Sequence, residues 1–213
     1  MYRVKFCRYL GVLIDEELRW VHHIDYLKTK LIKFVGIFYK IRGLIPSKIL
    51  QNLYYSFIYP HLTYCIEIYA NTCYSYLDPL IKLNNKLLRI LQNRKNDAPL
   101  SVLYKNYNTL MIPELYTMYV ARFVRKCQQN RHDMPGLFSN FFSKNCDWHN
   151  HYTRQSMNLH IDRANCSFGQ RTIKYSGSQI WNQIPKSIQM IRSEKKFTQR
   201  LKDLYRTQYK VIK

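Results

Sequence analysis

The spacing of hydrophobic residues predicts a short β-hairpin followed by a long helix. Between Val4 and Ile14 the chain is rich in β-forming residues, and Gly11 offers a tight turn between two short strands. From Ile24 to Ile41 the hydrophobic residues instead recur with a helical period and fall within about 120° of arc. We therefore predict strands within residues 4–14 and a helix over 24–41.

The same periodicity predicts further helices along most of the chain. Pro60 is expected to break or kink the second helix, and Asp78-Pro79 is expected to open the third. The predicted helices cover residues 48–59, 79–91, 100–106 and 113–130.

The helical period disappears from residue 131 to about residue 172, which we interpret as a long connection. Two short helices are expected after it, over 177–183 and 194–209. The sequence does not indicate a function for Trp181-Asn182, for which a buried Trp181 with Asn182 as a helix cap is the simplest structural interpretation. The predicted fold is mainly α: a short N-terminal β-hairpin, a helical bundle and a small irregular and helical C-terminal segment. The corresponding segments are residues 1–20, 21–130, 131–175 and 176–213.

Composition adds a strong positive charge to this picture. The 213 residues include 34 Lys and Arg against 13 Asp and Glu, a formal net charge of +21, and 15% of the residues are aromatic. A surface so basic and so aromatic favours a polyanionic partner, most commonly nucleic acid. The alternative is a basic protein of the translation or membrane-surface kind.

Nothing in the sequence is typical of a membrane span or a secreted protein. The most apolar stretch, residues 53–76, is interrupted by Pro60 and Glu67, and Arg3 and Lys5 interrupt any leader-like apolar run. The six cysteines are irregularly spaced without a Cys-x-x-Cys pair, which favours reduced thiols in the nucleus or cytoplasm.

Two rows of basic residues are candidate nucleic-acid contacts, because each is expected on the helix side opposite the apolar stripe. Such a row can follow a phosphate backbone, although many rows of this kind are only solvated helix surfaces. The first row contains Lys30, Lys33 and Lys40, and the second contains Lys82, Lys86 and Arg89.

We find no catalytic motif in the sequence. The only acidic cluster, Asp15-Glu16-Glu17, sits between a predicted strand and a predicted helix, where it suits the start of the helix better than two-metal catalysis. Zinc binding remains an alternative at Cys146-x-x-His149, with further candidate ligands at His151, His160 and Cys166. Chance clustering is the simpler explanation of that group, so we assign no metal ligand.

The order of several short motifs resembles reverse transcriptases of LINE-type non-LTR retrotransposons, close to the Jockey and CR1 groups. The resemblance covers nearly the whole chain, from the end of the palm through the thumb to the segment after it. Its motifs are Lys5-Phe-Cys-Arg-Tyr-Leu-Gly-Val-Leu-Ile-Asp15, Leu18-Arg-Trp20, His23-Ile24, Leu53-Tyr-Tyr-Ser-Phe-Ile-Tyr-Pro-His-Leu-Thr-Tyr-Cys65, Leu83-Asn-Asn-Lys-Leu-Leu-Arg-Ile90, His151-Tyr-Thr-Arg154, Gly169-Gln-Arg-Thr172 and Trp181-Asn-Gln-Ile-Pro185.

The resemblance implies RNA-directed DNA synthesis, with a primer–template duplex as partner. In that family Mg²⁺ is held by palm aspartates, but the Asp-Asp hairpin, the fingers and most of the palm have no counterpart here. We therefore expect no Mg²⁺ site in this chain, no catalysis by this chain alone, and a missing palm and fingers portion as a second partner. The primer-grip turn would correspond to Arg8, Tyr9, Leu10 and Gly11, and the nucleic-acid-facing thumb helix to the region from Lys28 to Lys40.

Two other functions stay open at this point. The first is an independent basic helical protein that binds RNA or DNA without catalysis. The second is a zinc-stabilised interaction domain built around Cys146 and His149.

Overall fold

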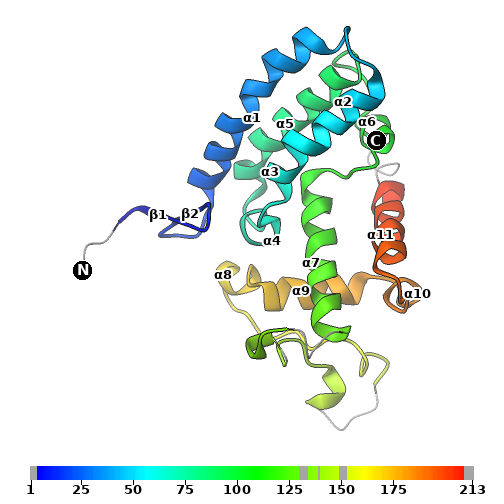
Figure 1. The fold of residues 1–213 in the computed structure, drawn as a ribbon. Helices are drawn as coiled ribbons and strands as arrows, with labels where there is room; N and C mark the ends of the chain where they lie inside the picture. Colours follow the sequence, from blue (N-terminus) through cyan, green and yellow to red (C-terminus); the bar gives the residue numbers. More distant parts are fainter. Residues whose placement is uncertain (1–3, 130–133, 139, 149–152, 209–213) are drawn as a thin grey trace. The chain divides into compact units, whose positions relative to one another are not determined.

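The computed structural model describes residues 4–129, 134–138, 140–148 and 153–208, and it divides into two compact units (Figure 1). Unit 1 is formed by the chain up to Leu115 together with the chain from Tyr205, and unit 2 is formed by Tyr116–Leu204. The predicted segments 1–20, 21–130, 131–175 and 176–213 follow the resemblance rather than compactness, so this division does not test them.

Unit 1 begins with the predicted hairpin. Strands β1 (Phe6–Tyr9) and β2 (Val12–Asp15) pair antiparallel with Tyr9 opposite Val12. The two residues between them, Leu10 and Gly11, have φ angles of 46° and 83°. Two consecutive positive φ angles in a two-residue loop are the pattern of a type I′ turn, which matches the natural twist of a hairpin.

The helical part of unit 1 is built around α1 (Val21–Ile41) and α5 (Tyr74–Leu91), which pack side by side (Figure 1). Their leucine and isoleucine stripes face inward, as the period predicts. The remaining elements are α2 (Ser47–Leu53), a π-helical segment (Tyr54–Ile58), α3 (Tyr59–Thr63), α4 (Ile66–Tyr69), α6 (Leu100–Asn106) and the first turn of α7 (Ile112–Gln129).

Neither of the helix boundaries predicted at a proline is found. Pro60 does not end the second helix, because the preceding π-helical segment keeps the chain helical from Ser47 to Thr63. Asp78-Pro79 does not open the third helix, since α5 starts at Tyr74 and contains Pro79. Pro79 lies inside α5, where a proline removes one backbone N–H donor without by itself ending the helix.

A buried polar network supports the core of unit 1. The Tyr54 hydroxyl donates to Asn84 Oδ1 at 3.2 Å, and Asn84 Nδ2 donates to the Tyr104 hydroxyl at 3.1 Å. The Tyr104 hydroxyl in turn donates to Asn85 Oδ1 at 2.6 Å. Buried amides and hydroxyls are costly unless they are paired, so this chain of bonds fixes the relative register of three helices.

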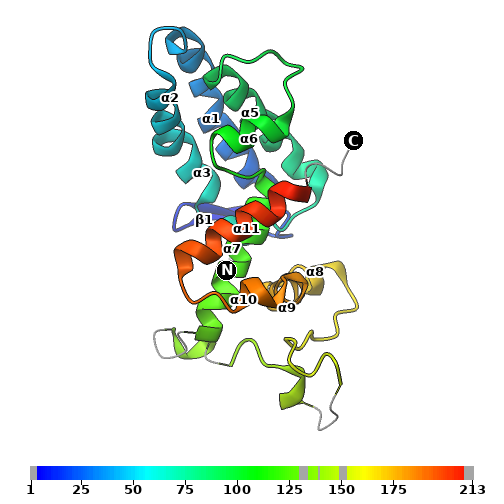
Figure 2. The same cartoon turned by 90° about the vertical axis from the view of Figure 1, so that its right-hand side faces the viewer.

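In unit 2, α9 (Ile173–Gln183) crosses the second part of α7 (Figures 1 and 2). Gly177 permits this crossing, because a Cβ there would lie 3.0 Å from carbons of Phe142 and Val124. The other elements are two short 3₁₀ turns (Gly136–Phe138 and Asn145–Asp147), α8 (Ser167–Gln170), α10 (Lys186–Gln189) and α11 (Glu194–Gln208), which ends in unit 1.

Asn182 does not cap a helix, contrary to the prediction. It lies near the end of α9, where its side chain accepts from the Leu159 N–H and donates to the Leu159 carbonyl, both at 2.9 Å. Trp181 beside it is partly buried and packs near Phe197, at 6.1 Å between ring centroids. The two bonds of Asn182 therefore hold the irregular chain before α8 against α9.

The predicted fold class is confirmed: the described chain is mainly helical with a two-stranded N-terminal hairpin. Among the described helices, none combines the length and the apolar character that crossing a membrane requires.

Candidate nucleic-acid interface

The turn predicted as a primer grip is fixed to the helices of unit 1 through its backbone. The Tyr64 hydroxyl donates to the Leu10 carbonyl at 2.5 Å, and a Cβ on Gly11 would contact the Tyr64 ring at 3.6 Å. The side chains of Tyr9 and Leu10 are exposed to solvent by 65% and 72%. The turn therefore has a fixed backbone and leaves two apolar side chains free for a ligand.

A second set of contacts joins the hairpin to the start of α1. The Leu13 N–H donates to His23 Nδ1 at 3.3 Å, and the Phe6 and His22 rings lie 4.7 Å apart. Burial, with a smaller contribution from the charge of Lys30, lowers the pKa of His23 to about 4. His23 is therefore neutral at pH 7, as an acceptor at Nδ1 must be.

The acidic cluster after β2 has a structural role at the start of α1. The Asp15 carboxylate accepts the backbone N–H groups of Arg19 and Trp20 at 2.8 and 2.6 Å, and Glu17 forms a 2.7 Å ion pair with Arg19. These carboxylates are engaged separately and do not converge, so they do not fit the Mg²⁺ ions of a polymerase.

The ring of Tyr26 brings the hairpin and the basic row of α1 together. The Arg8 guanidinium lies 5.8 Å from its centroid and 3.5 Å from its hydroxyl, and Lys30 Nζ lies 4.6 Å from the same centroid. A hydrogen bond from Lys30, followed by the charges of Lys30 and Arg8, lowers the pKa of the Tyr26 hydroxyl. The hairpin turn and the basic row of α1, which were predicted as separate contacts, thus meet at Tyr26, which was not among the predicted residues.

Lys33 and Lys40 extend this surface along α1. Both are exposed, and at about 100° per residue they lie on the same side of the helix as Tyr26 and Lys30. We call Arg8, Lys30, Lys33 and Lys40 the basic strip. Lys28 is half-buried and about 140° away around the helix, so the structure does not bring it to the strip.

The second predicted row, on α5, offers less free charge. Lys82 forms a 2.7 Å ion pair with Asp78 one turn earlier, which also raises the pKa of Lys82. Arg89 is half-buried, and its Nε has no hydrogen-bond partner. Lys86 is exposed and lies on the same side of α5 as the other two.

The alternative zinc site falls partly outside the described residues, because His149 and His151 are not among them. Cys146 and Cys166 are exposed, and His160 stacks on Trp148 at 4.8 Å between centroids. Within the described ranges, no three Cys, His, Asp or Glu side chains are placed to hold one metal ion.

Sequence reasoning missed Tyr26, although its spacing carried a signal. Tyr26 and Lys30 are four residues apart and therefore neighbours on one helix side, where a cation and an aromatic ring attract. The contact with Arg8 could not be read from spacing, because it depends on how the hairpin folds back on α1.

No protein-family model, curated protein or solved structure matches this chain, so its function has to be argued from the geometry of these residues.

Proposed function

We propose that unit 1 binds the phosphate backbone of an RNA–DNA primer–template duplex, as the thumb-side portion of an RNA-directed DNA polymerase. The single observation that carries this proposal is the meeting of Arg8 and Lys30 on the Tyr26 ring. It makes the hairpin and the helix row one continuous basic surface, as a duplex lying across both elements requires.

The dimensions and charges of the strip suit a phosphate backbone. Lys30 and Lys40 are ten residues apart, or about 15 Å along α1. Over that length a duplex carries roughly one charge per 1.7 Å of its axis. Among the described residues no ion pair neutralises Lys30, Lys33 or Lys40, so their charge is available to a polyanion. Lysine side chains on phosphates position a duplex without reading its bases.

The test is the salt dependence of binding to an RNA–DNA hybrid. Each lysine that releases a counterion contributes about 0.7 to 0.9 to the slope of log affinity against log salt. The triple variant K30Q/K33Q/K40Q should therefore flatten the slope by roughly two to three. A matched control, K186Q/K195Q/K196Q, removes the same charge from exposed positions of unit 2 and should change the slope by less than about one.

An unchanged slope in the triple variant would show that the strip is only a solvated surface. The same would follow if the control variant flattened the slope equally, because binding would then depend on net charge alone. Lys33 and Lys40 are exposed, and Lys30 is half-buried against the Tyr26 ring, so we expect the triple variant to lose about 1 to 2 kcal/mol of stability; its urea unfolding curve, measured beside the binding, checks that it remains folded.

A further inference from the structure

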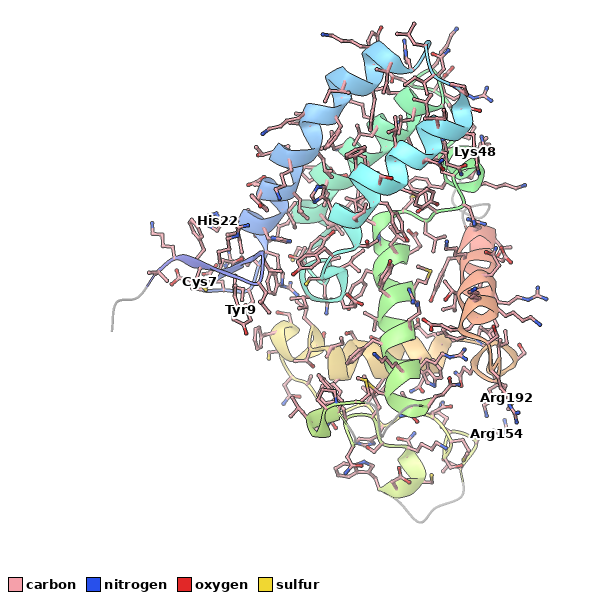
Figure 3. The ribbon with its side chains drawn as sticks, viewed as in Figure 1. Cys7, Tyr9, His22, Lys48, Arg154 and Arg192 are labelled. Carbon is pink, nitrogen blue, oxygen red and sulfur yellow. The ribbon has the colours of Figure 1, made fainter. Side chains whose placement is uncertain are left out.

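Unit 1 contains a cleft that the proposed duplex interface does not use. It has a volume of about 330 Å³ and lies where the start of α2, the end of α5 and the end of α6 meet. Lys48 on its rim lies well away from Cys7 and Tyr9 of the hairpin (Figure 3). The cleft therefore needs an explanation separate from the basic strip.

Leu91 and Tyr107 form the apolar part of the cleft, and the charged residues that line it are all positive. The rest of the lining consists of two cations, three amides and a hydroxyl: Lys48, Arg94, Gln51, Gln92, Asn106 and Ser47. Its lining contains no carboxylate, and in the described part of the chain neither cation is in an ion pair. Two unpaired cations facing one cleft favour an anionic ligand.

The amides form a rigid neutral floor for the cleft. Gln92 Nε2 donates to the Leu103 carbonyl and Asn106 Nδ2 donates to Gln92 Oε1, both at 3.0 Å. Gln51 Nε2 donates to the Asn106 carbonyl at 3.4 Å. These bonds join α2, α5 and α6, so the floor is preorganised before any ligand arrives.

The backbone also fixes the position of Arg94. Asn93, with φ of 48°, ends α5 in the left-handed conformation. The Arg94 N–H donates to the Arg89 carbonyl at 2.9 Å and the Asn93 N–H donates to the Ile90 carbonyl at 3.1 Å. This is the bond pattern of a Schellman motif, which fixes the direction in which the chain leaves a helix. Arg94 is therefore placed at the cleft by the end of α5 and not by a mobile loop.

A count of donors and acceptors indicates which anion fits. Lys48 Nζ has one weak bond, 3.5 Å to Gln51 Oε1, and therefore keeps two N–H donors. Arg94 adds the five donors of its guanidinium, and Ser47 adds a hydroxyl. The amides donate to two backbone carbonyls and to one another. The ligand must supply several acceptor oxygens, and its charge should approach the +2 of Lys48 and Arg94.

We propose that this cleft binds a phosphate monoester. Such a group carries about −1.5 to −2 charges at pH 7 and three strong acceptor oxygens, which match the free donors of Lys48 and Arg94. The volume is at the lower end of the roughly 300 to 1,000 Å³ typical of ligand pockets, which suits one phosphate with one attached ring better than a duplex. A free nucleotide and the terminal phosphate of a nucleic-acid strand both supply this chemistry.

The experiment titrates the full chain with adenosine monophosphate and adenosine, following the side-chain amide signals of Gln92 and Asn106 by NMR. Adenosine monophosphate should shift both signals saturably, and adenosine should not. The variant K48Q/R94Q should weaken binding by about a hundredfold or more, since it removes both cations and each lost charge-assisted hydrogen bond is worth about tenfold or more. The control K195Q/K196Q removes the same charge elsewhere and should bind as the wild type does.

A second titration, with a short oligonucleotide carrying either a 5′-phosphate or a 5′-hydroxyl, separates the two sources. Preference for the 5′-phosphate strand over the 5′-hydroxyl strand assigns the site to strand ends, and equal affinity of the two strands with saturable binding of the nucleotide assigns it to free nucleotides; either supports a monoester site. Equal affinity of K48Q/R94Q and wild type, equal loss in the control, or no saturable shift would overturn it. None of these outcomes depends on the basic strip. A negative result for the cleft therefore does not contradict the duplex proposal, and a negative salt-slope result does not contradict the phosphate-monoester proposal.

Discussion

Acidification should destabilise unit 1 through His23 and loosen the hairpin that carries Arg8. The imidazole is 1% exposed, accepts the Leu13 N–H at Nδ1 and packs edge-on against Tyr69 at 5.1 Å between centroids. A proton on Nδ1 would remove the acceptor for Leu13 and place a charge among buried rings. The native state therefore resists protonation while the unfolded chain does not.

The magnitude follows from the two pKa values. In the unfolded chain His23 titrates near 6.5, and in the folded chain near 4. Between these values the unfolded state binds more protons, so stability falls as the pH falls. The loss reaches about 2 kcal/mol at pH 5 and approaches about 3 kcal/mol below pH 4, where the native state also becomes protonated.

The assay is urea unfolding of wild type and His23→Asn at pH 7 and pH 5. Asparagine keeps an acceptor near Nδ1 but does not titrate, so it should lose some packing stability at both pH values and lack the extra loss of about 2 kcal/mol between them. Other acidic groups titrate equally in both proteins and cancel in the comparison. If wild type and His23→Asn lose the same free energy of unfolding between pH 7 and pH 5, the assignment of a depressed pKa to His23 is wrong.

Three further substitutions test the packing and the backbone hydrogen bonds of the helices. Gly177→Ala should destabilise unit 2, because a strain of about 1 to 3 kcal/mol against Phe142 and Val124 exceeds the gain of about 1 kcal/mol in helix propensity. Gly36→Ala should instead stabilise α1 by about 1 kcal/mol, because its Cβ would meet nothing within 4 Å. If Gly177→Ala and Gly36→Ala shift the thermal unfolding temperature equally, the packing argument is wrong. Asn182→Ala should cost about 1 to 3 kcal/mol by removing both bonds to the Leu159 backbone, and faster hydrogen exchange at the Leu159 amide is the local measurement of that loss.

Hydrophobic periodicity was sufficient to predict most elements of the fold. The helix over 100–106 has the predicted bounds, and the helices predicted from Ile24 and Pro113 begin only a few residues earlier in the structure. The period reports which residues are buried along one helix, so it also predicted that Lys33 and Lys40 would be exposed. Lys28 was carried over from the resemblance, and the same period already places it on a different side of the helix from Lys30, Lys33 and Lys40.

Features that depend on distant segments could not be predicted in the same way. The cleft combines residues from three separate elements, and each of Lys48, Gln92 and Asn106 looks like an ordinary surface residue in its own segment. The helix continues through Pro60 after a local change from α to π hydrogen bonding, and the spacing of apolar residues does not reveal such a change. Periodicity describes a single element, whereas a binding site arises where several elements meet.

The π-helical segment at Tyr54–Ile58 has a consequence for how such chains diverge. Its wider turn holds one residue more than an α turn needs, as the bond from the Tyr59 N–H to the Tyr54 carbonyl shows. A single-residue deletion there would convert the segment to regular α-helix and would leave the stretches before and after it helical. Because the π turn takes up the extra residue, the deletion would leave the residues that follow at nearly the same rotation about the helix axis, and Tyr64 would keep its bond to the hairpin turn. The segment is thus a point where one codon can be lost without reorienting the hairpin or dissolving a helix, and related chains are expected to differ in length at this point in the middle of a helix.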